Sequence, residues 1–460
     1  MTRCASALLA CALLLAPHGA ANAAAKTKKK KSAKAAQAKS GLELKIEQWT
    51  MKNGLRVVYL HHDRVPAVTV QVWYHVGSKD EHLGTRGVAH MFEHLMFKGS
   101  KRVKPEAHAR MISAVGGSVN AFTTQDLTAY HNTLPKQYLD FAVKLEAERM
   151  RHLLLIDKHI DSEREVVKEE KRKRLENSPI GRSLEAIYEM AYKKHPYQWT
   201  PAGKLRDLNA AKRAFYTRFY NTYYVPNNAT LVVVGDVSKA QVKAAADKHF
   251  GPIPAGKKPP RVTVREGAQT KLRERTANWP SQLAVVLGAY HIPGANSPDM
   301  APLQVLSAIL SAGRSSRLHQ DVVRKRKLAL QAGGFARPQE HPGLMMIYAV
   351  GLPSHDVSKM KDALLAEVER VAKSTITKAE LKKAKNQLAT SRLMSLRTIW
   401  GIAYQIGSSA YLKGNPTAFL DEVAKIDRVS AADVKRVAKK YLTRENLSIL
   451  LLPPGQGGGK

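Results

Sequence analysis

Apolar runs place several β-strands in the first half of this chain. The runs are rich in β-branched and aromatic residues and are bounded by turn residues, a pattern typical of strands. They cover residues 55–60, 67–76 and 228–234, with one or two further strands in 118–134. The run at 228–234, Asn-Ala-Thr-Leu-Val-Val-Val, is apolar almost throughout and indicates a buried strand that Gly235-Asp236 ends.

Segments with apolar residues three and four positions apart separate these strands and predict helices. They cover residues 86–97, 136–154, 162–177 and 240–249. Strands and helices are mixed without strict alternation, which favours a layered α+β fold over a doubly wound parallel sheet.

A segment rich in proline and glycine, Gly-Pro-Ile-Pro-Ala-Gly-Lys-Lys-Pro-Pro at 251–260, divides the chain. The order of elements then repeats, with a strand, a helical segment, a strand and a helix, followed by two further helices and a last strand. These segments are 282–291, 301–327, 343–353, 357–372, 379–396, 431–441 and 447–452. The 460 residues therefore predict two homologous domains of roughly 200 residues each. We place them at 42–250 and 269–453, joined by a linker at 251–268 and followed by a Gly-rich tail at 454–460.

The first residues have the pattern of a secretory signal. Arg3 supplies a positive charge, residues 4–16 are almost wholly apolar, and Ala21-Asn22-Ala23 offers a small-x-small cleavage site. The apolar run is too short to cross a bilayer. Leu8-Leu9-Ala10-Cys11 also resembles a lipidation box, but the apolar run continues to Leu15, which fits that alternative poorly. We expect a signal peptide at 1–23 and export to the periplasm or beyond.

Both cysteines, Cys4 and Cys11, lie inside the predicted signal, so the mature chain must hold any metal through histidine and carboxylate. The formal net charge is +36, from 74 Lys and Arg against 38 Asp and Glu. Seven lysines lie within residues 26–39, so residues 24–41 are expected to form a solvated tail that contacts an anionic envelope surface. No zinc knuckle, RNP-type motif or basic-aromatic interleaving accompanies this charge, so we expect no specific nucleic-acid binding.

One short motif carries metal chemistry: His90-Met-Phe-Glu93-His94, on the predicted helix 86–97. Residues at i and i+4 of a helix lie on one face, so His90 and His94 can direct two imidazoles at one ion. Glu93 shares that face and is left to accept a proton from a water that the metal activates. Two surface histidines are the simpler explanation, but they do not account for a glutamate on the same face. Zn²⁺ suits this set of groups.

The third ligand is expected from a later acidic helix, Glu163-Arg-Glu165-Val-Val-Lys-Glu169-Glu170. Glu163 and Glu170 are seven residues apart and share a helix face, so one can bind the ion while the other orients a histidine. Glu169 points about 100° away from Glu170, so only one of the two serves. Spacing alone does not choose between them.

These motifs together resemble the pitrilysin/insulinase family, whose His-x-x-Glu-His signature is the inverted zincin pattern. The resemblance covers about residues 45–450 and extends to Gly87–Ser100, Asn120-Ala-Phe-Thr-Thr, the acidic helix, His195-Pro-Tyr and Tyr224–Asp236. The short, two-domain members related to the mitochondrial processing peptidase are the most similar. The resemblance implies two domains of the processing-peptidase-like metallohydrolase type, each a mostly antiparallel sheet packed with helices, which enclose a chamber for an extended peptide.

The resemblance also assigns roles to residues. His90, His94 and Glu170 match the zinc ligands, Glu93 the general base, and Glu163 the acid behind the ligands. Asn120 and Ala121 match the edge strand that pairs with the substrate backbone. The implied activity is that of a zinc-dependent metalloendopeptidase acting on peptides or unfolded segments.

One departure from the family pattern concerns the second half. Active single-chain members carry an arginine and, seven residues later, a tyrosine that hold the substrate and support the oxyanion. The corresponding stretch here is 317–331, where Leu330 or Gln331 stands in place of the tyrosine. Losing one oxyanion donor typically costs about 10²–10³ in turnover. We therefore expect a homologous partner chain, or a second copy of this chain, to supply these groups.

Two other functions remain open from the sequence. One is a non-catalytic assembly subunit that keeps the peptidase fold, although the presence of all four metal-site residues argues against it. The other is an anionic-surface binding protein whose affinity comes from the positive charge.

Overall fold

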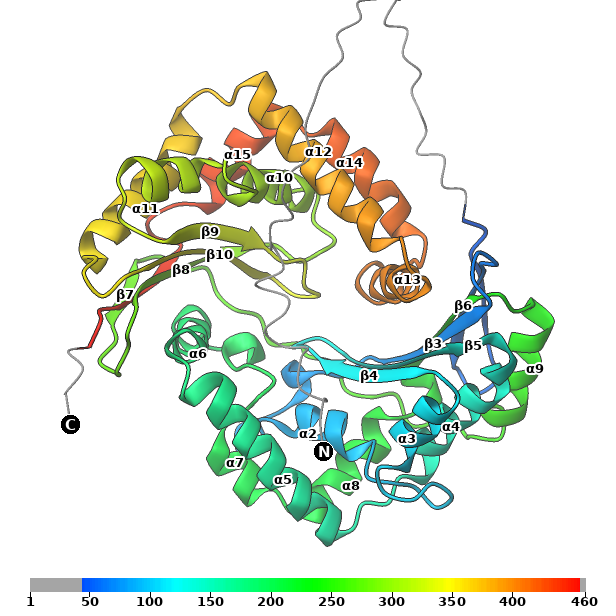
Figure 1. Ribbon diagram of the computed structural model, residues 1–460. Coiled ribbons are helices and arrows are strands. Elements are labelled where there is room, and N and C mark those ends of the chain that lie inside the picture. Colours follow the sequence, from blue (N-terminus) through cyan, green and yellow to red (C-terminus); the bar gives the residue numbers. More distant parts are fainter. Residues whose placement is uncertain (1–43, 456–460) are drawn as a thin grey trace, which may run out of the picture.

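The computed structural model describes residues 44–455 (Figure 1). The predicted signal peptide, with Cys4 and Cys11, and the predicted Lys-rich tail lie outside these residues. Among the described residues, none of the helices combines the length and the hydrophobicity needed to cross a bilayer.

Two β-sheets form the framework, one in each half of the chain. The first has six strands in the order β1-β2-β6-β3-β5-β4, and the second has five in the order β7-β11-β8-β10-β9. The first-half strands are β1 (Glu47–Thr50), β2 (Arg56–His61), β3 (Ala67–Tyr74), β4 (Ser118–Thr123), β5 (Thr128–Pro135) and β6 (Ala229–Gly235). The second-half strands are β7 (Arg273–Thr276), β8 (Ala284–Ile292), β9 (Gln331–Ala336), β10 (Gly343–Gly351) and β11 (Leu447–Leu452).

The two sheets repeat one topology. In each, the last strand of the half is parallel to one neighbour and antiparallel to the other: β6 pairs parallel with β2 and antiparallel with β3, and β11 does the same with β7 and β8. All other pairs are antiparallel. The predicted duplication of an α+β unit with a mostly antiparallel sheet is confirmed.

Helices cover both sheets. The first half contains α2 (Val88–Leu95), α3 (Ala107–Ala114), α4 (Leu139–His152), α5 (Asp157–Lys171), α6 (Pro179–Ala191), α7 (Leu205–Ala210), α8 (Arg213–Tyr223) and α9 (Lys239–His249). The second contains α10 (Met300–Ser311), α11 (Val357–Lys373), α12 (Lys378–Ser395), α13 (Ile399–Lys413), α14 (Glu422–Arg428) and α15 (Ala431–Tyr441). The largest core of each half lies between its sheet and the helices on one face.

Each half lends one helix to the other half's sheet (Figure 1). Helix α13 of the second half packs on β3 and β6, where Ile402, Ala403 and Ile406 meet Trp73 and Val232. Helix α6 of the first half packs in the same way on β8 and β11. The exposed face that a two-layer half would leave is therefore covered by the other half.

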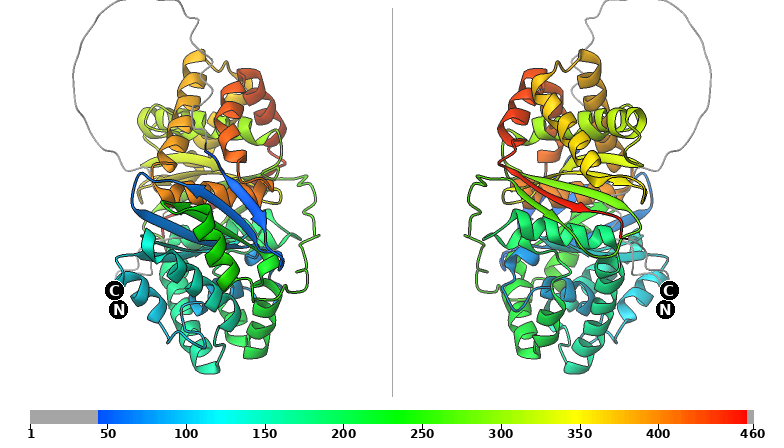
Figure 2. Two further views of the ribbon diagram at one scale, coloured as in Figure 1. Left: turned by 90° about the vertical axis from the view of Figure 1, so that its right-hand side faces the viewer. Right: turned by 90° about the vertical axis from the view of Figure 1, so that its left-hand side faces the viewer.

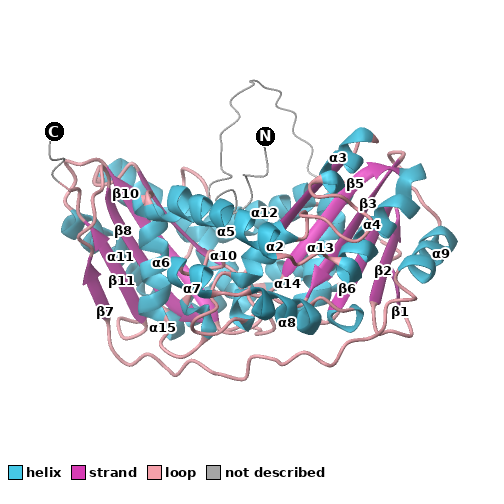
Figure 3. Ribbon diagram, turned by 90° about the horizontal axis from the view of Figure 1, so that it is seen from below, coloured by secondary structure: helices cyan, strands magenta, loops and turns pink. Residues whose placement is uncertain are grey.

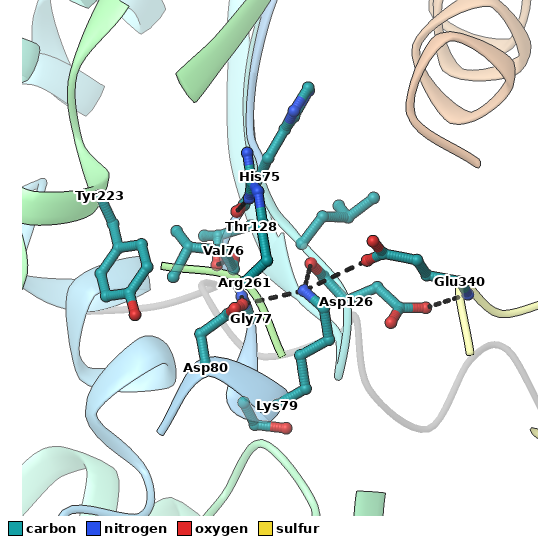
Figure 4. Close-up of polar contacts among 12 residues, drawn as sticks. His75, Val76, Gly77, Lys79, Asp80, Asp126, Thr128, Tyr223, Arg261 and Glu340 are labelled. Carbon is teal, nitrogen blue, oxygen red and sulfur yellow. Dashed lines mark hydrogen bonds and ion pairs between the residues drawn. The ribbon is translucent and has the colours of Figure 1, made fainter. Parts of the chain in front are cut away.

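A buried polar network joins the halves where they meet (Figure 4). The Lys79 ammonium, 2% exposed, lies 2.9 Å from Asp80 Oδ2 and 3.4 Å from Glu340 Oε2, and donates to the Asp126 carbonyl oxygen at 2.9 Å. The Tyr411 hydroxyl of α13 lies 2.9 Å from the same carbonyl oxygen and also contacts the Glu340 carboxylate. Glu340 and Tyr411 come from the second half and the other three residues from the first, so the network fixes how the halves sit together.

Between α9 and β7 the chain runs as an extended segment, residues 250–272, without helix or strand (Figure 3). It follows the outside of the molecule from one half to the other, along one side of the two stacked halves in Figure 2. Arg261 attaches it to the first half by donating to the His75 carbonyl oxygen at 3.0 Å and to Asn228 Oδ1 at 2.9 Å.

Several predicted helix limits were wrong. The predicted helix 301–327 is broken: α10 ends at Ser311, and a turn with Gly313 at φ +76° precedes a π-helical segment, His319–Lys325. The acidic helix starts five residues earlier than predicted, at Asp157, and its last predicted turn is a π-helical turn, Arg172–Glu176. The segment 118–134 is two strands, β4 and β5.

Candidate metal centre

Helix α2, which carries the His-x-x-Glu-His motif, starts at a position that favours glycine. Its N-cap Gly87 has φ +101°, in the left-handed region that other residues rarely adopt. The buried Glu81 carboxylate accepts hydrogen bonds from the backbone N–H groups of Gly87, at 2.9 Å, and Ala89, at 2.7 Å. A carboxylate is favourable at a helix N-terminus, because it satisfies free N–H groups and complements the helix dipole.

The opposite face of α2 is fixed by aromatic packing. Phe92 stacks on Phe219 of α8, with ring centroids 5.5 Å apart, and its carbonyl oxygen accepts from the Tyr130 hydroxyl at 2.9 Å. Phe92 is fully buried. This anchoring sets the rotation of α2, so that His90 and His94 face α5.

His90, His94 and Glu170 are brought together by α2 and α5. His94 Nε2 lies 3.4 Å from Glu170 Oε2, and His90 Nε2 lies 3.8 Å from Glu170 Oε1. One ligand atom from each of the three residues lies within 4.8 Å of the other two. Among the described residues, this is the cluster of His, Asp and Glu whose geometry suits a metal ion.

The cluster fits a zinc ion. Two ligands that each lie about 2.0–2.2 Å from one tetrahedral zinc are separated by about 3.3–3.6 Å. The His94 separation of 3.4 Å, to Glu170 Oε2, lies in this range, and the His90 separation of 3.8 Å, to the other Glu170 oxygen, is slightly longer. Two imidazole nitrogens and a carboxylate oxygen are also a donor set found in catalytic zinc sites, which leave the fourth position to water.

The fold distinguishes Glu170 from Glu169. The Glu169 side chain is 51% exposed and pairs with Arg172 and Lys173 on the surface. The Glu170 side chain is 17% exposed and faces the two histidines. Glu170 is thus the one of the two that can reach an ion held by α2.

Glu163 lies on α5, about two helical turns before Glu170, and contacts the Nδ1 side of the His94 ring. Its Oε2 is 3.3 Å from His94 Nδ1, and its Oε1 is 2.7 Å from Lys98 Nζ. A hydrogen bond to Nδ1 fixes the imidazole ring and leaves Nε2 as the atom that faces Glu170. Lys98, which follows the end of α2, was not predicted, because its contact with Glu163 depends on how α5 packs beside α2.

The Glu93 carboxyl group is buried beside the cluster, and its Oε2 has no hydrogen-bond partner. Burial raises the pKa of Glu93 above its usual range, although the neighbouring His94 opposes this shift. A buried acceptor without a partner is suited to take up a proton from a bound molecule.

The two histidines differ in protonation. Burial, reinforced by the charge of His94, lowers the pKa of His90 to about 3. Burial also opposes a charge on His94, but its hydrogen bonds with Glu163 and Glu170 outweigh this and raise its pKa to about 9. A metal that binds His94 must therefore displace a proton, so metal affinity should increase with pH.

Arg174 is a second residue that the sequence analysis missed. Its Nη1 lies 2.5 Å from Glu170 Oε1, so it holds the carboxylate oxygen that faces His90. Arg174 belongs to the π-helical turn Arg172–Glu176, and the Gly181 backbone packs against its carbonyl oxygen with no room for a side chain. The i, i+4 spacing from Glu170 was the only signal in the sequence.

Asn120 and Ala121 lie on β4, the edge strand of the first sheet. β4 pairs with β5 on one side and with no other strand of the described chain. The Asn120 side chain is exposed, and its Oδ1 accepts a hydrogen bond from the Ala121 N–H at 2.8 Å. The Ala121 N–H thus faces the free edge, where a further strand could pair with it.

In the second half, the structure ties Arg317 to its own domain. Its guanidinium binds Glu380 at 2.8 and 3.1 Å, Ser374 Oγ at 2.8 Å and the Thr375 carbonyl oxygen at 3.0 Å. Leu330, in contrast, is 49% exposed where β9 begins. Leu330 offers no polar group at the place of the tyrosine. The position seven residues before Leu330 is Val323, and seven before Gln331 is the exposed Arg324.

Comparison with known families gives two matches along the chain. The family model described as "Insulinase (Peptidase family M16)" matches residues 56–202. The model described as "Peptidase M16 inactive domain" matches residues 213–388. The His-x-x-Glu-His motif, Glu163 and Glu170 lie in the first match.

Individual relatives cover most of the chain. The zinc protease PqqE of Helicobacter pylori is 33% identical over 429 residues, which span 89% of this chain and 93% of that protein. The crystal structure of a protease from Helicobacter pylori superposes with a TM-score of 0.86 at 31% identity, covering 89% of this chain and 100% of that one. The mitochondrial-processing peptidase subunit beta of Lentinula edodes is 26% identical over 423 residues, covering 87% of this chain and 88% of that protein.

Proposed function

Because this chain belongs to the insulinase family of peptidases (peptidase family M16) and is a zinc metallopeptidase, we propose that His90, His94 and Glu170 hold its zinc. We propose further that Glu93 is the general base of peptide-bond hydrolysis. The observation that carries the proposal is the convergence of the three ligand atoms within 4.8 Å.

A bound zinc supplies a Lewis acid and lowers the pKa of water to about 7. The residues of the chain do the rest. Glu93 Oε2, buried and without a partner, accepts the proton when water attacks the peptide carbonyl. Glu163 holds His94 Nδ1, which keeps the ring oriented, and Arg174 pairs with Glu170 Oε1, which holds that carboxylate in place.

The substrate in this proposal is a peptide or an unfolded segment in extended form. The free edge of β4, with the outward Ala121 N–H, supports pairing with a peptide backbone. Pairing of this kind forms hydrogen bonds with the peptide backbone whatever its sequence. Recognition of the peptide side chains then depends on separate pockets. Asn120 must release the Ala121 N–H before a peptide pairs there.

The substitution Glu93→Gln tests catalysis separately from metal binding. It removes the base and preserves the shape, so hydrolysis of a quenched fluorogenic peptide should fall by at least about 100-fold. Zinc content, measured by mass spectrometry of the metal, should stay near one per chain. Glu170→Gln should lose zinc. The matched control is Glu169→Gln, which changes the neighbouring, exposed glutamate and should keep its zinc.

Unchanged hydrolysis by Glu93→Gln would contradict the assigned base and favour a role in assembly or surface binding. Equal zinc content in Glu170→Gln and Glu169→Gln would contradict the assigned third ligand. A purified wild-type chain with no stoichiometric divalent ion would contradict the whole site.

We propose that a homologous partner chain, or a second copy of this chain, supplies the substrate-holding groups that the second half lacks. The apolar, exposed Leu330 supports this, because it stands where the family pattern has the tyrosine. Losing an oxyanion donor costs about 10²–10³ in turnover, so the isolated chain should cleave peptides slowly, and a reconstituted pair should restore the rate. Turnover by the monomer that equals that of the pair would contradict this arrangement.

The proposal also includes export to the periplasm or beyond. Its support is the order of charged, apolar and small residues within residues 1–23. The seven lysines within 26–39 would then meet the anionic envelope surface. Sequencing the N-terminus of the exported protein tests this, because a start at residue 24 is expected and a start at Met1 would contradict it.

A further inference from the structure

The face of the first sheet that lies under α13 carries a row of residues directed at its free edge. Gln71 of β3 pairs with His131 of β5, and His131 pairs with Asn120 of β4. Residues paired directly across neighbouring strands point to the same face. The row therefore runs Gln71, His131, Asn120 across three strands, and its next position is the strand that a bound peptide would form.

Trp400, in the first turn of α13, lies over this row. Its carbonyl oxygen accepts from Gln71 Nε2 at 3.2 Å, and its ring lies 5.4 Å from the His131 ring. The backbone of Trp400 is thus above β3 and its ring above β5, so the side chain extends toward β4. The far end of α13 lies over the opposite part of the sheet, where the Ala410 carbonyl oxygen is 3.4 Å from Arg56 of β2.

Trp400 is held by aromatic neighbours and is still partly exposed. Its ring stacks on Tyr404 at 5.4 Å and 24°, and Tyr404 in turn contacts Phe122 of β4 at 5.8 Å. Trp400 is nevertheless 37% exposed, one of the largest apolar side chains that the described surface offers. The Asn120 side chain accepts from the N–H of Ala121, the next residue on its own strand.

We propose that Trp400, with Phe122 and His131, forms a subsite that selects a large apolar side chain, aromatic or long aliphatic, at the substrate residue opposite Asn120. The inference deepens the proposed function, because it depends on a peptide pairing with β4. In this proposal, helix α13 of the second half helps to select the peptides that the metal centre of the first half cleaves.

Distances across the sheet explain the preference for size. Neighbouring strands lie about 4.8 Å apart, so a peptide strand beside β4 would be about 10 Å from β5, above which the Trp400 ring lies. A side chain such as Phe, Trp or Met spans the gap to the ring, whereas Ala or Ser does not. Burial lowers the pKa of His131 to about 4, so the floor of the subsite is uncharged at neutral pH.

Specificity profiling of the zinc-loaded full chain tests the subsite. Quenched fluorogenic peptides would carry Phe or Ala at each position in turn, and kcat/KM would be compared for wild type and Trp400→Ala. Wild type should prefer Phe at one position, and Trp400→Ala should reduce that preference about tenfold, equivalent to about 1.4 kcal/mol. Trp400→Phe should retain most of it. Leu352→Ala, which removes another exposed apolar side chain, should change nothing.

Binding provides a measurement that does not depend on turnover. Glu93→Gln and Glu93→Gln/Trp400→Ala would be titrated with the same Phe and Ala peptides by fluorescence anisotropy. A loss of the Phe preference only in the double variant supports the subsite. Equal preference in both variants overturns it. Failure of the proposed function is recognised separately, as absence of hydrolysis by zinc-loaded wild type even in the reconstituted pair.

Discussion

The charged side chain of Asp299 connects two helices of the second half. It precedes α10 and accepts hydrogen bonds from Arg436 Nη1 at 2.6 Å, Lys440 Nζ at 2.9 Å and the Tyr441 hydroxyl at 2.6 Å. Burial opposes its charge, but these bonds outweigh burial and lower the pKa of Asp299 to about 2. The carboxylate thus links α10 to α15, the last helix before β11.

The substitution Asp299→Asn should therefore destabilise the protein in a pH-dependent way. The folded pKa is below the unfolded value of 3.8, so the ionised carboxylate stabilises the fold above about pH 4 and loses this effect as pH falls toward 2. The free energy of unfolding should fall by about 1–2 kcal/mol at pH 7, and the gap to wild type should narrow below pH 4.

Urea denaturation at several pH values measures this gap. Asp63→Asn, at a side chain that is 75% exposed, is the matched control and should follow wild type. A gap for Asp299→Asn that stays constant from pH 7 to pH 2 would show that lost packing, and not lost charge, is the cause.

Single residues of the candidate site were predictable only where local geometry decides. The four-residue spacing places His90 and His94 on one face of any helix. The choice of Glu170 over Glu169 depends on how α5 is rotated against α2, which packing of Phe92 and its neighbours sets. The contact of Arg174 depends on a π-helical turn that no periodicity in the sequence announces.

At the scale of elements, α13 shows why an apolar helix escaped the sequence analysis. Both its faces are covered, one by the first sheet and one by the second half, so it has no polar stripe from which a helical period could be read. The strands fared better, because apolar runs such as β6 and β11 are buried on both faces and stand out in any window.

Gly407 makes the close approach of α13 to the first sheet possible. A Cβ built at this position would lie 2.7 Å from Trp73 Cδ2 and overlap the indole ring. Gly-to-Ala substitutions inside exposed helices stabilise by about 1 kcal/mol, but here overpacking should dominate. Gly407→Ala should lower the free energy of unfolding by about 1–3 kcal/mol.

Thermal unfolding followed by circular dichroism checks this prediction. Gly267→Ala, in the extended segment between the halves, is the control, because nothing lies within 4 Å of its added Cβ. A higher melting temperature for Gly407→Ala would mean that α13 can move away from Trp73 without loss.

At the scale of the whole molecule, Lys79 is the centre of the contact between the halves. Its almost fully buried ammonium pairs with the carboxylates of Asp80 and Glu340 and donates to the Asp126 carbonyl oxygen. Lys79→Met leaves two carboxylates without their cation, and breaking a buried pair in this way costs about 3–5 kcal/mol. We expect the urea midpoint to fall strongly.

Lys361→Met is the matched control, since the ion pair of Lys361 with Glu274 is on the surface and should contribute at most about 1 kcal/mol. Similar urea midpoints for the two variants would contradict the proposal that the polar network around Lys79 stabilises the contact between the halves.

The duplicated architecture was predictable at this scale because both halves repeat the same order of strands and helices. The exchange of α6 and α13 was not, since a helix that packs on a distant sheet looks the same in sequence as one that packs on its own.

That exchange bears on how the molecule could divide. Separating the halves would expose an apolar sheet face of each half to water, including the side chains of Trp73 and Leu450. The covalent tie through residues 250–272 crosses the outer surface and contributes few such contacts. The pair of interlocked helices, and not the peptide connection, is what makes the two halves one body.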